Sequence, residues 1–176
     1  MQLTIRNKKS FTIIEVIMVV VLVAVFSYGI SIYVMRVIDS WQFLTQRYEL
    51  EQDGKLALDF IVRSCKEMDI DAFGNPTVIF GSASGIEFTD TDSETINYSF
   101  SDEEITKNNQ PLVKSVTSFE IEYYDSSNSE IDPGGGLLTT AQINDIWYVY
   151  VRFMLTKGEQ SAIYSSYIFP RNFLAR

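Results

Sequence analysis

The chain contains no histidine, and Cys65 is its single cysteine. Without histidine, neither a Ser-His-Asp nor a Cys-His catalytic arrangement can form, and the count excludes a metal site built on His and Cys ligands. One cysteine also cannot close a disulfide within the chain. These absences predict a protein that is not an enzyme and carries no cofactor, with Cys65 a small buried apolar residue of a helix.

Positive charge is scarce as well: 14 Lys and Arg residues stand against 23 Asp and Glu residues, which gives a formal net charge of -9. Three of the basic residues lie in the first ten positions, so the rest of the chain is more acidic still. Proteins that bind nucleic acid neutralise its phosphates with a basic surface. The composition therefore argues against a nucleic-acid partner and suits a domain outside the cytoplasm.

Proline is absent from the first 75 residues, and positions 16–35 form an uncharged, mostly apolar run of 20 residues. A helix of that length, at ~1.5 Å per residue, crosses a bilayer core of ~30 Å. Arg6, Lys8 and Lys9 precede the run, and basic flanking residues stay in the cytoplasm. The sequence therefore predicts one transmembrane helix, with its N-terminus cytoplasmic and the rest of the chain on the other side.

Glu15 is the one charged residue between positions 11 and 35. An acidic side chain at the centre of a membrane helix costs about 2.5–3.5 kcal/mol on a translocon scale. One interpretation gives this carboxylate a cationic partner, so that each charge offsets the desolvation of the other. The other lets it reach the lipid headgroups from the first turn of the helix. Its position alone does not separate these two interpretations.

The residues around Glu15 carry a recognisable motif, Lys-Lys-Ser-Phe-Thr-Ile-Ile-Glu at positions 8–15. With a short basic leader and a long apolar run, it resembles the type III signal of type IV prepilins and type II secretion pseudopilins. In that family a membrane-bound prepilin peptidase cuts just before the Phe and methylates the new amino group. The resemblance thus implies cleavage between Ser10 and Phe11 and N-methylation of Phe11. Ser10 stands where the family nearly always has Gly.

The same resemblance implies a role for Glu15 and leaves other interpretations of the segment open. In the family, this carboxylate pairs with the methylated amine of Phe11 on a neighbouring subunit as the helices assemble. An ordinary secretory signal has an apolar region of only ~7–15 residues, and Ser27, Gly29 and Ser31 offer only a faint cleavage site for it. An uncut signal anchor is the remaining alternative.

A helical pattern continues beyond the apolar run. From Val37 on, apolar residues recur three and four positions apart, polar residues can take the other face, and Gly54 is the only Gly or Pro before Met68. We therefore expect one helix from about Phe11 to about Met68, apolar in its first half and amphipathic in its second. The apolar stripe of the second half consists of Val37, Trp41, Leu44, Tyr48, Leu58, Ile61, Val62, Cys65 and Met68.

After Pro76 the apolar period changes to two, which is typical of β-strands. Phe119, Ile121 and Tyr123 alternate with polar residues, and Trp147, Val149, Val151, Phe153 and Leu155 share one face. The expected strands are 77–80, 86–89, 96–100, a segment from 111 to about 125, 146–155 and 162–169, with 102–107 a weak strand or turn and 126–145 a loop.

These elements define an expected organisation. Residues 1–10 are a cleaved leader, 11–35 the transmembrane half of the helix, 36–70 its amphipathic half, and 71–176 an antiparallel β domain. A long helix followed by antiparallel strands predicts an α+β class in which the helix packs on the sheet. This order resembles that of the type IV pilin-like fold, which is the fold that the resemblance implies.

The second half of the chain resembles one branch of the family more loosely. Segments 56–63, 112–116, 119–125, 147–155 and 170–173 are similar in spacing to the J-class minor pseudopilins and to the related large minor pilins. The implied function is a minor, tip-located pseudopilin of a type II protein secretion system. The implied partners are a prepilin peptidase, other pseudopilins or pilins, and the inner membrane, with the domain in the periplasm. A minor pilin of a type IV pilus, and a signal-anchored periplasmic binding domain or enzyme that never polymerises, remain alternatives.

Few other patterns suggest chemistry. Asp90, Asp92 and Glu94 are a weak candidate for a metal site, because they lack the Gly and the distal Glu of a calcium-binding EF-hand loop. A solvated turn is the alternative interpretation. The tyrosines of the expected strands could form an exposed patch for a partner, although cross-strand packing explains such residues more often.

Overall fold

The computed structural model describes residues 12–172. The chain divides into two compact units, Met1–Thr45 and Gln46–Arg176. The division falls within helix α1 (Ile13–Lys66), which is continuous over 54 residues and ends just before the expected Met68. It also falls inside the segment 36–70 that the sequence identifies as the amphipathic half of the helix.

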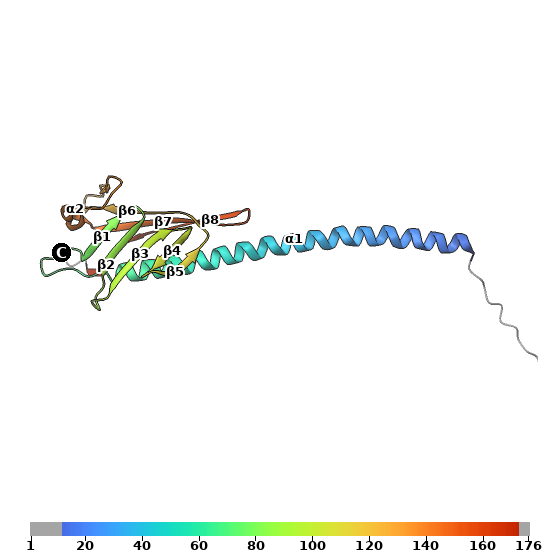
Figure 1. Ribbon diagram of the computed structural model, residues 1–176, viewed down its shortest axis with the longest axis horizontal. Helices are drawn as coiled ribbons and strands as arrows, with labels where there is room; N and C mark the ends of the chain where they lie inside the picture. The colour runs from blue at the N-terminus through green and yellow to red at the C-terminus, as the bar shows by residue number, and fades with distance from the viewer. Residues whose placement is uncertain (1–11, 173–176) are drawn as a thin grey trace, which may run out of the picture. The chain divides into compact units, whose positions relative to one another are not determined.

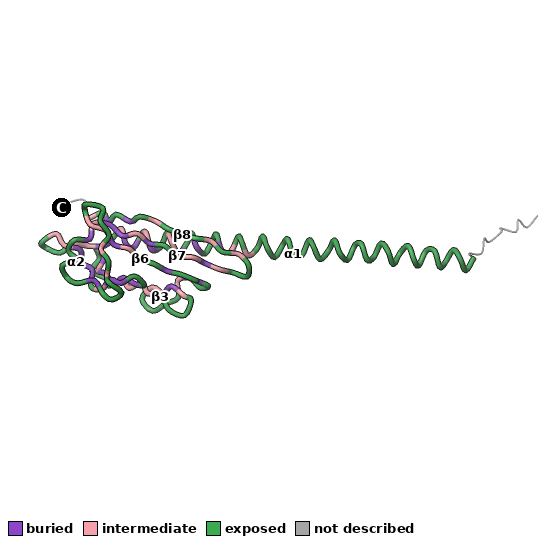
Figure 2. The backbone as a smooth tube through the Cα atoms, turned by 90° about the horizontal axis from the view of Figure 1, so that it is seen from above, coloured by how far each residue is buried: buried purple, intermediate pink, exposed green. Residues whose placement is uncertain are grey.

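The first unit consists, in its described part, of the exposed start of α1. Its residues, including the apolar ones, are exposed along the whole segment, which Figure 2 draws as a green tube. Within residues 12–172, α1 is the one helix that is long and apolar enough to cross a membrane. The predicted membrane-spanning capacity of this segment is therefore confirmed.

The second unit contains two antiparallel sheets that pack on the C-terminal part of α1 (Figure 1). The first sheet has the order β1-β2-β3-β4-β5 and the second the order β6-β7-β8. The strands are β1 (Val78–Ser82), β2 (Gly85–Thr89), β3 (Thr95–Ser101), β4 (Glu104–Lys107), β5 (Gln110–Lys114), β6 (Val116–Tyr124), β7 (Tyr148–Lys157) and β8 (Gln160–Ile168). A long helix packed on antiparallel sheets confirms the predicted α+β class and is consistent with a type IV pilin-like fold.

The alternating patterns place most strands as expected, but the expected segment from 111 to about 125 divides at Ser115, which has a φ of 63°, into β5 and β6 of different sheets. Phe119, Ile121 and Tyr123 of β6 are buried, as are Val149, Val151, Phe153 and Leu155 of β7. Trp147 precedes β7 and is half-buried, so it does not share the buried face of that strand.

Of the segment 102–107, expected as a weak strand or turn, Glu104–Lys107 form strand β4, and two-residue turns precede and follow it. Asp102 and Glu103 have φ of 52° and 60° and Asn108 and Asn109 have φ of 51° and 63°, the left-handed conformation that tight hairpin turns use.

The buried face of α1 differs from the predicted stripe. Burial begins at Leu50 and continues through Gly54, Ala57, Ile61 and Cys65, whereas Val37, Trp41, Leu44 and Tyr48 are exposed. Residues two positions apart on a helix point to different sides, so Tyr48 and Leu50 cannot share a face. Val37, Trp41 and Leu44 belong to the first unit, whose described residues are all helical or precede the helix.

Gly54 occupies the centre of this buried face because an aromatic ring lies directly on it. A Cβ atom at Gly54 would come within 2.2 Å of the ring of Tyr164 on β8. The Tyr164 hydroxyl donates a hydrogen bond to the carbonyl oxygen of Leu50 at 2.8 Å, which holds the ring across the helix. The sequence identifies this glycine only as a weak point, while the structure shows that the absence of a side chain lets the Tyr164 ring lie directly against the helix.

The segment 126–145, expected to be a loop, contains a short helix, α2 (Thr140–Asp145). Thr139 and Gln142 form a capping box, in which the Thr139 side chain accepts from the Gln142 N–H and the Gln142 side chain accepts from the Thr139 N–H. A Thr followed three positions later by Gln is a sequence signal for a helix start, so this helix could have been anticipated. The Ser, Pro and Gly residues before it obscure the signal.

The two sheets are joined by hydrogen bonds at the β1–β2 turn. The Tyr123 hydroxyl donates to the Ser82 carbonyl oxygen at 3.0 Å, and the Ile121 N–H donates to the Ala83 carbonyl oxygen at 2.9 Å. Ile86 and Phe88 from the first sheet and Val151 and Phe153 from the second belong to one buried core. The two hydrogen-bonded ladders therefore stabilise a single hydrophobic core.

Candidate functional site

Glu15 lies in the first turn of α1, where its N–H donates to the Thr12 carbonyl oxygen at 3.0 Å. Negative charge at a helix N-terminus is favourable because the free N–H groups there carry partial positive charge. None of the ion pairs among residues 12–172 includes Glu15. Its neighbours Ile13 and Ile14 are 82% and 71% exposed, so the carboxylate stands on an open apolar surface.

The other predicted residues of the N-terminal motif cannot be placed. The cleavage residue Ser10, the cleavage and methylation residue Phe11, and the topology residues Arg6, Lys8 and Lys9 lie outside the described residues. The structure therefore brings Glu15 together with the apolar helix that follows it, and the rest of the motif stays a prediction.

The weak metal candidates form a closed turn. Asp90 is buried, and its Oδ1 atom accepts hydrogen bonds from the backbone N–H groups of Asp92 at 3.0 Å and Glu94 at 2.9 Å. A carboxylate oxygen that caps its own turn in this way stabilises the hairpin between β2 and β3. Among residues 12–172, no group of three or more His, Cys, Asp and Glu side chains is placed to hold a metal ion.

A polar network crosses the interface between α1 and the first sheet. The Tyr98 hydroxyl donates to Ser64 Oγ at 2.9 Å, and Lys107 Nζ donates to the same oxygen at 3.4 Å. Ser64 and Tyr98 are both buried, so a substrate has no access to the serine oxygen. The contacts satisfy polar atoms at a helix–sheet interface, which is a structural role.

Cys65 is fully buried beside this network, as the sequence predicts. Burial raises the pKa of its thiol from 9.0 to about 12, with a smaller opposing effect of Lys107. Because only the thiolate reacts, alkylation by iodoacetamide at pH 8 should be about a thousandfold slower in the folded chain than in the urea-unfolded chain. Mass spectrometry of timed samples measures both rates, and equal rates would show that the thiol is accessible.

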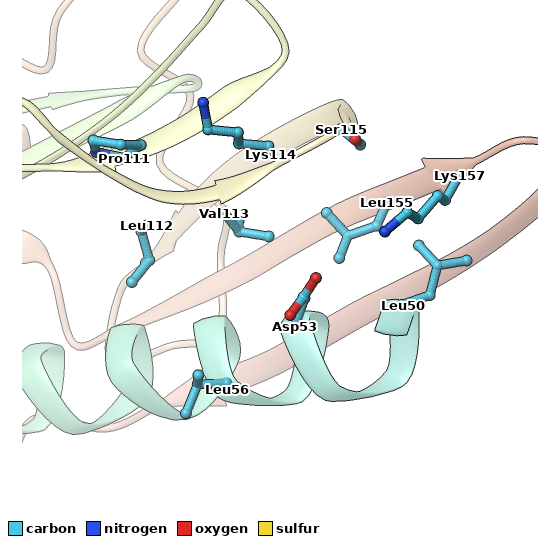
Figure 3. Close-up of a pocket in the computed structure, with 10 residues that line it drawn as sticks. All are labelled: Leu50, Asp53, Leu56, Pro111, Leu112, Val113, Lys114, Ser115, Leu155 and Lys157. Carbon is cyan, nitrogen blue, oxygen red and sulfur yellow. The ribbon is translucent and has the colours of Figure 1, made fainter. Parts of the chain in front are cut away.

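A cavity of about 460 Å³ opens between α1, β5 and the end of β7 (Figure 3). Its walls are mainly apolar, and Asp53 reaches from α1 toward the space beneath β5 and β7. Lys157 at its rim pairs with Glu49, and this hydrogen bond raises the pKa of the lysine. The complete lining is Leu50, Asp53, Leu56, Pro111, Leu112, Val113, Lys114, Ser115, Leu155 and Lys157. Six of these residues are apolar, and Asp53, Lys114, Ser115 and Lys157 supply the polar atoms of the lining.

The outer face of the second sheet carries a group of rings that we call the aromatic cluster: Tyr124, Tyr148, Tyr150, Tyr167 and Phe169. Tyr124 and Tyr148 stack with ring centroids 4.8 Å apart and planes 5° apart, and Tyr150 and Tyr167 lie 4.6 Å apart. Phe169 lies 4.8 Å from Tyr148. The sequence raises the possibility of such a patch, but it does not reveal that β6, β7 and β8 align these rings.

Comparisons with known proteins add no further constraint, since no protein-family model matches the chain and the search of curated proteins finds no match.

Proposed function

We propose that the protein is a non-enzymatic subunit of a membrane-anchored, type IV pilin-like filament, and more specifically a minor pseudopilin of a type II secretion system. The observation that carries the proposal is the start of α1, a continuous helix whose apolar side chains are all exposed and which bears one carboxylate in its first turn. At roughly 25 cal/mol per Å² of apolar surface, leaving such a helix in water is unfavourable. A bilayer, and then neighbouring helices of the same kind, would cover it.

The proposed sequence of events follows from charge and hydropathy. The basic residues Arg6, Lys8 and Lys9 hold the N-terminus in the cytoplasm, the helix spans the inner membrane, and the β-sheet unit lies in the periplasm. Prepilin peptidase cuts between Ser10 and Phe11 and methylates the Phe11 amine. The positive amine of one subunit then meets the Glu15 carboxylate of another as the helices pack side by side.

The described part of the chain supports a non-enzymatic role. Ser64, which accepts a hydrogen bond from Lys107, is buried, and the lining of the cavity in Figure 3 is mostly apolar and includes neither Ser64 nor Cys65. The β-sheet unit serves as the domain that the helix carries into the assembly.

Processing by the peptidase tests the proposal directly. Coexpression of the full chain with a prepilin peptidase should remove the ten leader residues and leave N-methyl-phenylalanine at the new N-terminus. Intact-mass measurement of the purified protein, with and without the peptidase, detects both changes. An unchanged mass would contradict the proposal and favour a signal-anchored periplasmic domain that does not polymerise.

A gene deletion distinguishes a secretion-system pseudopilin from a minor pilin of a type IV pilus. Deleting the gene in its native host should abolish export of folded proteins to the medium if the protein belongs to a secretion system. Loss of surface pili with normal export would assign it instead to a type IV pilus, as a minor pilin.

A further inference from the structure

The aromatic cluster lies on the side of the second sheet that faces away from the core. Val149, Val151 and Phe153 of β7 point into the core, whereas Tyr148 and Tyr150 alternate with them on the outer face. The strand register places Tyr124 opposite Tyr148 and Tyr150 opposite Tyr167. Cross-strand neighbours on one face of a sheet lie within contact distance, so the rings form a continuous surface over β6, β7 and β8.

Two rings of the aromatic cluster are largely exposed to solvent, although a third ring beneath them is buried. Tyr167 is 58% and Phe169 46% exposed, although Tyr148 beneath them is only 6% exposed. The outer face of an antiparallel sheet is ordinarily polar, because it meets water. Tyr148 gains packing from its neighbours, but the outward ring faces of Tyr167 and Phe169 contribute little to stability and remain available to a ligand.

Carboxylates border the cluster. Glu122 lies opposite Tyr150 on the outer face, and the Tyr124 hydroxyl donates to its Oε2 atom at 2.6 Å. This hydrogen bond, with smaller effects of burial and of the charges of Glu122 and Glu130, raises the pKa of Tyr124. Burial and the neighbouring Tyr167, Asp125 and Glu122 likewise raise the pKa of Tyr148. The Glu122 carboxylate therefore places a negative charge at the edge of the cluster, in direct contact with the Tyr124 hydroxyl.

We propose that the aromatic cluster is a docking surface for an arginine-bearing segment of a partner protein. The face of an aromatic ring attracts cations, and a nearby carboxylate adds a charge-assisted hydrogen bond. Arginine fits both features at once, because its planar guanidinium stacks on a ring while its N–H groups reach an acid at the edge.

The proposal predicts binding of a defined peptide to the full chain in detergent micelles. The probe is a labelled Gly-Arg-Gly-Arg-Gly peptide, and its matched control replaces each Arg with citrulline, which has the same shape and no charge. We expect saturable binding of the arginine peptide, measured by fluorescence anisotropy, and a dissociation constant that Tyr167→Ala raises about fivefold. Glu122→Gln should also weaken binding while keeping the acceptor for Tyr124.

Ile163→Ala supplies the matched control variant, because Ile163 is 56% exposed on β8 and lies outside the cluster. It should leave the dissociation constant unchanged, and circular dichroism should show that all variants keep the folded sheet. Equal binding of the citrulline peptide would overturn the proposal. So would displacement of the probe by maltotriose, which would indicate a sugar ligand, and so would an equal effect of Ile163→Ala and Tyr167→Ala. So would the absence of saturable binding to the wild-type chain. None of these results bears on processing before Phe11, so the two proposals can fail independently.

Discussion

Replacing Gly54 with alanine is expected to lower the free energy of unfolding of the β-sheet unit by about 2 kcal/mol, the size of a typical overpacking penalty. The new methyl group would stand 2.2 Å from the Tyr164 ring. To relieve the clash the ring must move, which breaks its hydrogen bond to Leu50 and its stacking on Phe153, 5.4 Å away. The higher helix propensity of alanine, about 1 kcal/mol, offsets only part of this loss.

Urea denaturation of the full chain in detergent, followed by circular dichroism of the sheet, measures the effect. Gly29→Ala is the matched control, because Gly29 lies in the same helix and a Cβ there has no neighbour within 4 Å. It should leave the urea midpoint unchanged. Combining Gly54→Ala with Tyr164→Ala should cost less than the sum of the two single changes, since the second removes the obstacle to the first. Strict additivity would show that the ring is not the cause.

Glu15→Ala is expected to reduce incorporation of the protein into filaments by at least about tenfold while leaving the β-sheet unit folded. Under the proposed function, the change leaves the Phe11 amine without its carboxylate in an apolar surrounding. Removing one member of a buried ion pair costs roughly 3–5 kcal/mol, which is ample for such a loss. Immunoblotting of sheared filament fractions, compared with whole cells, measures the incorporated share.

Two controls separate the ion pair from other effects. Glu15→Gln keeps the size and removes the charge, so it should fail as Glu15→Ala does. Asp39→Ala removes an exposed acid from the same helix beyond the apolar run and should assemble normally. Intact masses must show that both Glu15 variants are still cut before Phe11. Normal incorporation of both Glu15 variants would contradict the ion-pair account. It would leave the interpretation in which the Glu15 carboxylate reaches the lipid headgroups.

The spacing of apolar residues was enough to predict the α+β class, because burial in the core requires apolar residues at regular helical or strand spacing. The alternation around Ile121 and Val151 survives in β6 and β7, since a shift of one residue would turn their apolar side chains into water. The start of α1 was equally predictable from its uncharged run. Neither pattern depends on which distant residue lies opposite.

Features that depend on distant partners could not be predicted. Gly54 and Tyr164 are far apart in the sequence, and nothing in either segment shows that one ring covers the other. The buried stripe of α1 was misplaced at Tyr48 for a similar reason, because helical spacing alone allows two faces and the sheets select the one that begins at Leu50. For the candidate site, the motif around Glu15 can be recognised from the sequence, whereas the alignment of Tyr124, Tyr148 and Tyr167 depends on strand register.

The hydrogen bond from Tyr164 to Leu50 spans 114 positions of the chain. During synthesis, α1 leaves the ribosome long before β8, so the face at Leu50 and Gly54 lacks the Tyr164 ring until almost the whole protein has been made. Contacts between residues so distant in sequence form slowly, and chains whose apolar surface stays exposed in the meantime are prone to aggregate. Nascent chains should therefore depend on early membrane insertion or on a chaperone that shields this face until the last strand arrives.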